Sequence, residues 1–301
     1  MLSFERMVKM RGLHKQERIN ILLKCLMTGL FILGLGIFSY PFVADAINNF
    51  YDQIMLEKLS KEHKQHFLQE NQQLEEMKKR NLTLNQNKCE RNVPGICLSG
   101  ASTDVANQSS KESDTYKEKH LLALIYIPKI NVGLPLFDTT TNELLEDGVT
   151  LLPGTSYPVG GKNSHAVITG HCGLPNKKIF TDLENLSQGD LIYIEIANKT
   201  LAYEVKEFQT VLPTEVNKLK IVEGQDLITL VTCTPYMVNT HRLLVTATRT
   251  EVQEKHANKA KKKVKYYHTL RLVLLTVLLL SVVIILIKWL LKKIKLYKKL
   301  I

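Results

Sequence analysis

Closely spaced CxxC cysteine pairs, glycine-rich phosphate loops and clustered metal ligands are missing from this 301-residue sequence. Each absence excludes a class of binding site. The five cysteines, at positions 25, 89, 97, 172 and 233, include no CxxC pair, so a structural zinc site is not expected. No Gly-rich phosphate loop follows an apolar run, so we expect no cofactor, and without clustered ligands we expect no bound metal. A disulfide framework is not required either, because about 200 residues can bury a core of their own.

Acidic residues are also absent beyond Glu254, where thirteen Lys and Arg residues follow. The first 46 residues carry six basic and three acidic residues, and residues 47–254 carry 21 basic and 26 acidic residues. The formal charge of +11 therefore comes from the two ends and not from the middle of the chain. A nucleic-acid-binding protein carries its positive charge on the folded surface that meets phosphate, so we exclude nucleic acid as a partner.

Two long apolar runs lie between these basic ends. The run from Cys25 to Ala44 has twenty residues without a formal charge, and the run from Leu272 to Ile287 has sixteen. With its flanks, each is long enough to cross a bilayer core about 30 Å thick. We predict transmembrane helices over residues 21–46 and 270–291. A cleaved signal peptide is the alternative for the first, although no small-residue cleavage site follows Tyr40-Pro41.

The flanking charges predict the orientation of both spans. The positive-inside rule places the basic tail 1–20 in the cytoplasm and the middle of the chain outside. The second span then returns, so the basic tail 292–301 is cytoplasmic and the chain is a two-span protein of the cell membrane. Six lysines in the predicted stalk 252–269 oppose this orientation. We interpret the stalk as solvated, with a contact to anionic membrane lipid or wall polymer as the alternative.

The extracellular middle segment divides into three parts. Residues 47–81 repeat apolar positions at helical spacing, which predicts an amphipathic helical region. Residues 82–119 are rich in Asn, Ser, Thr, Lys and Glu, which is typical of a linker. Residues 120–251 alternate short β-branched runs with Gly, Pro and Asn turns, so we predict an all-β barrel or sandwich. The runs are LLALIYI, VGLPLF, HAVIT, LIYIEI, LAYEVKEF, LITLVT and RLLVTA.

Three side chains suited to acyl transfer stand where predicted strands begin or end. Cys233 ends a strand before Pro235, although a lone Cys at such a place is more often a small buried hydrophobic residue. His171 follows the apolar run Ala166–Thr169 at a strand-to-loop exit. Arg242 begins the last strand nine residues beyond Cys233, and strands joined by a short loop usually pair. A thiol, an imidazole and a fixed cation so arranged form a Cys-His transfer site.

Four stretches within residues 121–249 match a known family. They are IPKI (Ile127–Ile130), TSYPVGGKNSHAVITGHCGLP (Thr155–Pro175), IFTDLENLSQGD (Ile179–Asp190) and TLVTCTPYMVNTHRLLV (Thr229–Val245). They resemble the sortases, in particular class C, the pilin-polymerising branch. The resemblance implies a closed sortase-type β-barrel of about eight strands with short helices. It also implies that Cys233 is the nucleophile, His171 the acid or base, and Arg242 the cation that positions the sorting signal.

The sequence departs from the class C pattern at two points. Those enzymes generally carry an Asp-Pro-aromatic lid, and no such tripeptide precedes Ile127, so autoinhibition by that device is not expected. Cys172 stands where the family commonly has another polar residue, but only Cys233 has a Thr before it and an Arg after it. We interpret His165 and His241 as structural side chains.

Cys89 and Cys97 flank Pro94-Gly95 in the segment that carries the lid in class C enzymes. One hypothesis is that a disulfide between them orders a replacement lid. Two unpaired thiols in a linker are the alternative.

The resemblance implies a membrane-anchored cysteine transpeptidase. Such an enzyme cleaves an LPXTG-like signal between Thr and Gly through a thioacyl intermediate and passes the acyl group to an amine. The expected partners are pilin subunits bearing sorting signals, with the acceptor amine on a lysine of a second pilin. The alternatives are housekeeping anchoring to a cell-wall precursor amine, and a non-catalytic, membrane-tethered scaffold for pilus assembly.

Reporter fusions at the two ends test the predicted topology. Reporters at Met1 and Ile301 should both be active in the cytoplasm, because the basic tails 1–20 and 292–301 stay inside. A tag inserted at Lys111 should be accessible from outside. A C-terminal reporter found outside the cell would show that the lysines of 252–269 had set the orientation instead.

Overall fold

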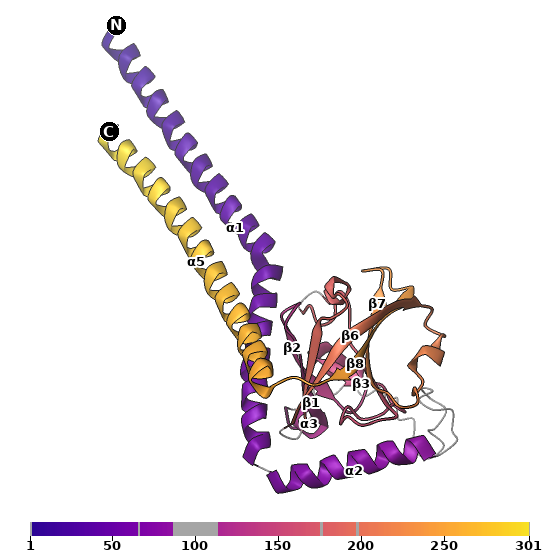
Figure 1. Ribbon diagram of the computed structural model, residues 1–301. Helices are drawn as coiled ribbons and strands as arrows, with labels where there is room; N and C mark the ends of the chain where they lie inside the picture. Colours follow the sequence, from indigo (N-terminus) through magenta and orange to yellow (C-terminus); the bar gives the residue numbers. More distant parts are fainter. Residues whose placement is uncertain (1, 66, 87–113, 175–176, 197–198, 301) are drawn as a thin grey trace. The chain divides into compact units, whose positions relative to one another are not determined.

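The structure is a computed structural model that describes residues 2–65, 67–86, 114–174, 177–196 and 199–300 (Figure 1). Five α-helices and eight β-strands are found in these ranges. The helices are α1 (Leu2–Gln65), α2 (Phe67–Gln86), α3 (Asp114–His120), α4 (Asn142–Asp147) and α5 (Glu254–Leu300). The strands are β1 (Leu121–Ile127), β2 (Val132–Phe137), β3 (Val149–Leu151), β4 (Ser164–Thr169), β5 (Leu191–Ile196), β6 (Lys199–Val211), β7 (Asp226–Thr234) and β8 (His241–Thr250).

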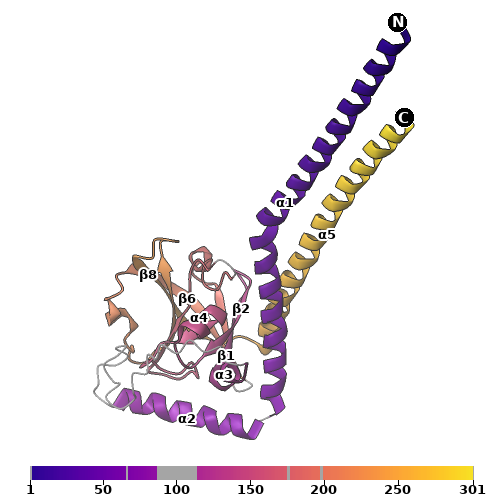
Figure 2. The ribbon, with the colours of Figure 1, turned by 180° about the vertical axis from the view of Figure 1, so that it is seen from behind.

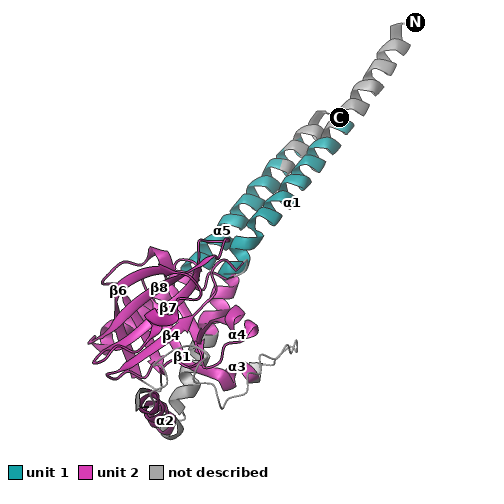
Figure 3. Cartoon of the chain, turned by 90° about the vertical axis from the view of Figure 1, so that its right-hand side faces the viewer, with its two compact units in different colours: residues 1–46, 270–301 teal, residues 47–269 magenta. Residues whose placement is uncertain are grey.

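The chain divides into two compact units, residues 1–46 with 270–301 and residues 47–269 (Figure 3). In the first unit α1 and α5 run in opposite directions, and Arg271 Nη1 donates to Asp45 Oδ2 at 2.6 Å. Two segments, Leu22–Ile54 and Glu254–Trp289, are long and apolar enough to cross a membrane by length and composition. The apolar helices expected at both ends of the chain are therefore present.

The second unit is built on a closed barrel of eight strands in the order β1-β2-β3-β4-β7-β8-β6-β5 (Figures 1 and 2). The pairs β2–β3 and β4–β7 are parallel, and the other pairs are antiparallel. The prediction of a closed eight-stranded barrel is confirmed. Closure leaves no free sheet edge, so every strand is held on both sides.

Burial on both faces explains why β1 has the unbroken apolar sequence LLALIYI. Its inward residues Ile125 and Ile127 lie in the main core. Its outward residues Leu124 and Tyr126 pack in a second cluster that includes Ala257 of α5. The predicted stalk 252–269 thus contains the first turns of α5, which cover part of the outer surface of the barrel.

Helix α2 also packs on the barrel. Leu74 is buried in the main core, and Met77 packs against it. Asn81 holds the backbone of Tyr157 from both sides: its Nδ2 donates to the Tyr157 carbonyl at 2.9 Å, and its Oδ1 accepts from the Tyr157 N–H at 2.8 Å. The helix continues to Gln86, so the first residues of the expected linker 82–119 are helical. Cys89 and Cys97 lie outside the described residues.

The parallel β4–β7 pair determines which loops come together. Its register runs from Ser164 opposite Asp226 to Thr169 opposite Val231. Because both strands run the same way, their carboxyl ends lie at the same end of the barrel. The residues that follow Thr169 and Val231 are therefore neighbours although they are about sixty positions apart in the sequence.

Candidate functional site

Cys233 is the second-to-last residue of β7 and is a half-buried free thiol. The hydroxyl of the preceding Thr232 is buried and donates to the Gly170 carbonyl at 2.8 Å. The Gly170 N–H in turn donates to the Val231 carbonyl at 3.1 Å. These two hydrogen bonds hold the end of β7 against the residue that follows β4, so the backbone that carries Cys233 is fixed.

His171 follows Gly170 at the exit of β4 and is half-buried. A side chain at position 170 would not fit, because a Cβ there would lie 2.8 Å from Phe180 and 2.9 Å from Val149. The His171 carbonyl accepts from the Phe180 N–H at 3.1 Å. Glycine thus lets the chain pass close to β3 and brings the His171 backbone beside the end of β7.

Arg242 stands directly opposite Cys233 in the antiparallel β7–β8 pair. Directly opposed residues point to the same face of a sheet, with Cα atoms about 5 Å apart. The Arg242 Nη1 donates to the carbonyls of Asn239 at 3.1 Å and His241 at 3.0 Å, which anchors the guanidinium beside the β7–β8 turn. The three predicted site residues therefore gather at one end of the barrel, from the ends of β4, β7 and β8.

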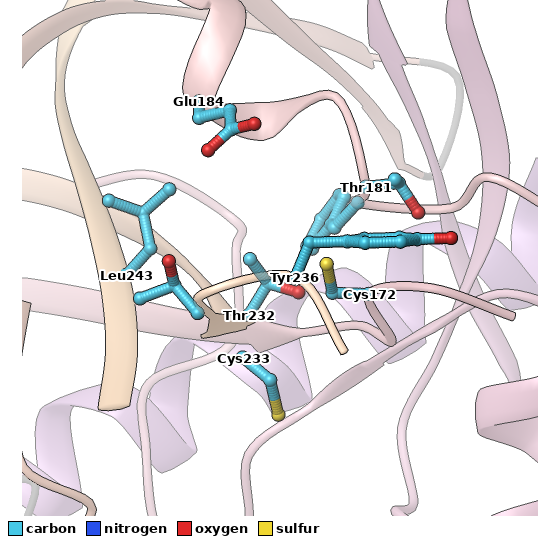
Figure 4. Close-up of a pocket in the computed structure, with 9 residues that line it drawn as sticks. Cys172, Thr181, Glu184, Thr232, Cys233, Tyr236 and Leu243 are labelled. Carbon is cyan, nitrogen blue, oxygen red and sulfur yellow. The ribbon is translucent and has the colours of Figure 1, made fainter. Parts of the chain in front are cut away.

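A small pocket lies between Cys233 and Cys172 (Figure 4). Its free space is about 10 Å³, roughly that of one water molecule. Tyr236 packs over Gly173 and, with Leu243, fills this side of the site. The Cys233 thiol is directed away from the Cys172 thiol (Figure 4). Little free space is therefore left beside Cys233 on the side that faces Cys172.

Cys172 lies in a setting that opposes ionisation. Burial raises the pKa of its thiol, and the neighbouring Cys233 and the carboxylate of Glu184 raise it further. The thiolate is the nucleophilic form of cysteine, so a raised pKa makes Cys172 a poorer nucleophile at neutral pH. The assignment of the nucleophile to Cys233 stays a prediction.

The two further histidines considered in the sequence are held by hydrogen bonds, and His165 lies near the amino end of β4, away from Cys233. His165 is buried in β4, and its ring nitrogens lie 2.9 Å from the Lys220 carbonyl and 2.7 Å from the Thr229 hydroxyl. His241 Nδ1 lies 2.9 Å from the Thr240 hydroxyl. Both contacts support the structural interpretation of these side chains.

Sequence reasoning missed three contributors to the site. In the sequence Thr232 stands out only as the residue before Cys233, but its hydroxyl joins the end of β7 to Gly170 after β4 by a hydrogen bond. Gly170 is required by close packing, and Tyr236 limits the space beside the thiols. Of the three, only Thr232 had a signal in the sequence. Side chains alternate between the two faces of a strand, so Thr232 is expected to point to the face opposite Cys233.

Within the described ranges, no group of three or more His, Cys, Asp or Glu residues lies close enough to hold a metal ion. The site combines a thiol on a fixed backbone, a histidine on the neighbouring strand exit and an arginine whose guanidinium is hydrogen-bonded beside the β7–β8 turn. Groups of these types at one end of a closed barrel are those of a Cys-His transfer site. The comparisons with known proteins extend this assignment.

The chain belongs to the sortase family, whose members are known as cysteine transpeptidases. The family model described as the Sortase domain matches residues 125–250. The chain is 34% identical to a solved structure of a sortase C-1 mutant from S. pneumoniae, over 66% of this chain and 98% of that one, with a TM-score of 0.54. It is 33% identical to sortase C1 of GBS pilus island 1, over 62% and 85% of the two chains, with a TM-score of 0.51.

Among curated proteins, the chain is 31% identical to sortase A of Streptococcus agalactiae over 113 residues, which are 36% of this chain and 45% of that protein. It spans between 45% and 64% of the length of the curated relatives that it matches.

A pH titration of stability tests the structural assignment of His165. Burial lowers the pKa of its imidazole below the ordinary value of 6.5, so the folded chain keeps the ring neutral while the unfolded chain protonates it. Its stabilising contribution is therefore present above about pH 6.5 and declines, by at most about 1.4 kcal/mol per pH unit, as the pH falls further. We expect the stability difference between the protein and His165→Gln, from urea unfolding in detergent, to shrink between pH 7 and pH 5. A difference that stays constant would contradict this assignment.

Proposed function

We propose that the chain is a membrane-anchored cysteine transpeptidase that cleaves an LPXTG-like sorting signal between Thr and Gly. The observation that carries the proposal is the gathering of His171, Cys233 and Arg242 at the carboxyl ends of β4 and β7 and the start of β8. Family membership and the chemistry of these groups support it together.

In the proposed mechanism, the Cys233 thiol gives its proton to His171, and the resulting Sγ thiolate attacks the Thr carbonyl carbon of the signal. The C–N bond to Gly breaks as His171 gives a proton to the leaving amine, and the Thr acyl group remains on sulfur as a thioester. The guanidinium of Arg242 faces the same side of the sheet and stabilises negative charge on the carbonyl oxygen or orients the signal. The nitrogen of an acceptor amine then attacks the thioester carbonyl, neutral His171 takes up the amine proton, and the C–S bond breaks to release the amide product and the Cys233 thiolate.

We propose that the acceptor is a lysine of a second pilin, so that repeated transfers polymerise pilin subunits. Likeness to class C sortases, among them the sortase C1 of a pilus island, supports this acceptor. A free lysine amine has a pKa near 10.4, so only about one in a few thousand is neutral at pH 7. Proton uptake by His171 is therefore needed at this step.

Anchoring of surface proteins to a cell-wall precursor is the second candidate. The curated relatives called sortase A favour it. The same proton transfer serves either amine, so the two candidates differ in the acceptor and not in the first half of the reaction.

Both candidates place the barrel outside the cell between two spans. The two helices that are apolar enough to cross a membrane, one before and one after the barrel in the sequence, support this arrangement. The predicted domains remain part of the proposal, with the basic tails 1–20 and 292–301 in the cytoplasm and the catalytic barrel at 120–251.

Cysteine and histidine variants test the proposed roles. Cys233→Ala and His171→Ala should each lower cleavage of a quenched sorting-signal peptide by at least about 10³-fold, because each removes a group that the reaction requires. Cys172→Ala is the matched control and should keep most of the activity. Residual activity of Cys233→Ala that disappears when Cys172 is also replaced would assign the nucleophile to Cys172.

The acceptor is tested by mixing the detergent-solubilised chain with a pilin that bears its sorting signal. We expect a ladder of covalent multimers on a denaturing gel, with no activating mutation, since the sequence before Ile127 has no Asp-Pro-aromatic lid motif. A pilin without its acceptor lysine should give no ladder. If only hydrolysed monomer and wall-precursor conjugate form, the anchoring function replaces the polymerising one.

A further inference from the structure

A second, larger cavity lies at the other end of the β4–β7 pair. It is bordered by Ser164 and Asp226, the first residues of these two strands. Seven residues of extended strand separate Asp226 from Cys233, which is about 23 Å. The cavity measures about 490 Å³, within the range of small-molecule sites. Helix α2 lies along this end of the barrel and forms one wall (Figures 1 and 2).

Positive charge is concentrated in the walls of this cavity. Lys78, Lys162, Lys199 and Arg249 line it, and among the described residues Asp226 is the acidic one that does so. By contrast, residues 47–254 taken together carry more acidic than basic residues. A concave site lined by one sign of charge focuses its field and attracts ions of the other sign.

The negative charge of Asp226 is already engaged by the protein. Its carboxylate accepts from the Gly161 N–H at 2.8 Å and the Tyr203 hydroxyl at 3.1 Å. The Ser164 hydroxyl, which donates to the Gly161 carbonyl at 2.6 Å, lies 3.4 Å from the same carboxylate. Arg249 lies over the Tyr203 ring, and its Nη1 donates to the Ala202 carbonyl at 3.4 Å. Asp226 thus links Gly161 to Tyr203 by hydrogen bonds at the floor of the cavity.

The two lysines at the rim form no direct ion pair with a described residue, although Lys199 lies near enough to Glu75 to interact electrostatically with its carboxylate. In the part of the chain that the structure describes, neither Lys162 nor Lys199 forms an ion pair, whereas Lys78 pairs with Glu75 at 2.7 Å. Their charges are therefore available to a ligand.

The elements that carry these cations are held in place. Helix α2 is fixed by Asn81 and by the buried Leu74. Lys162 follows two glycines with φ of +75° and +118°, a conformation that other residues rarely adopt. The Asn163 Oδ1 then accepts from the Gly224 N–H at 2.6 Å, which closes the turn. The segments that carry these cations are thus held in position before a ligand binds.

We propose that this cavity is a binding site for a phosphate-bearing anion. Lysine ammonium groups bind phosphate as point charges, and the arginine at the floor adds further N–H donors. Two sources carry this chemistry outside a cell: a glycerol-phosphate polymer and the headgroup of an anionic lipid. The site would dock the catalytic barrel on such an anion without touching Cys233.

The first test measures binding of inorganic tripolyphosphate to the full chain in neutral detergent at low ionic strength, by calorimetry. The double variant Lys162→Gln/Lys199→Gln should bind about tenfold more weakly, because two attractive charges are lost. The matched control is Lys129→Gln/Lys218→Gln, which removes two exposed lysines elsewhere and should stay within about twofold of the wild type. Sorting-signal cleavage should be unchanged in both.

Competition then identifies the source. Displacement of tripolyphosphate by a soluble glycerol-phosphate oligomer assigns the site to the polymer, and displacement by a short-chain anionic lipid alone assigns it to the headgroup. Displacement by neither would overturn the proposal. Equal losses in the two double variants, or no binding to the wild type at low ionic strength, would also overturn it, whatever the outcome for cleavage.

Discussion

The parallel pairing of β4 with β7 is the constraint on which the proposed chemistry depends. It brings His171 and Cys233 together from positions sixty-two residues apart. The Thr232 hydroxyl bond to the Gly170 carbonyl, at 2.8 Å, closes the pair at the site itself. A register slip of one residue would turn every side chain of β7 to the opposite face, so Cys233 would leave the side that Arg242 shares. The closed barrel prevents such a slip by holding β7 between β4 and β8.

The same two strands separate the chemistry from the basic cavity. Their carboxyl ends carry the thiol and the imidazole, and their amino ends, Ser164 and Asp226, border the cavity that we assign to a phosphate-bearing anion. The barrel core between the two ends is packed with buried apolar side chains such as Ile168 and Leu230. Substitutions at the rim of the cavity are therefore expected to leave Cys233 undisturbed.

Local signals in the sequence predicted much of this fold. Pro235 and the apolar run before it located the end of β7, and the short loop to Arg242 predicted the β7–β8 pair. The β4–β7 pair could not be predicted from the sequence, because no local sequence pattern specifies a parallel partner strand about sixty residues away. The helical extension of α2 to Gln86 was missed because its polar residues resemble a linker, while its stability comes from Leu74 and Asn81 on the barrel. The basic cavity was missed because its cations come from four separate segments.

The central claim is that Cys233 carries the acyl group, and acid-quenched peptide mapping of the acylated chain tests it most directly. The full chain is mixed briefly with a sorting-signal peptide, quenched at low pH, digested and analysed by mass spectrometry. The account predicts a thioester to the Thr of the signal on the peptide that contains Cys233, and unmodified Cys172. An acyl group found on Cys172, or no acylated peptide while the signal is being cleaved, would contradict it.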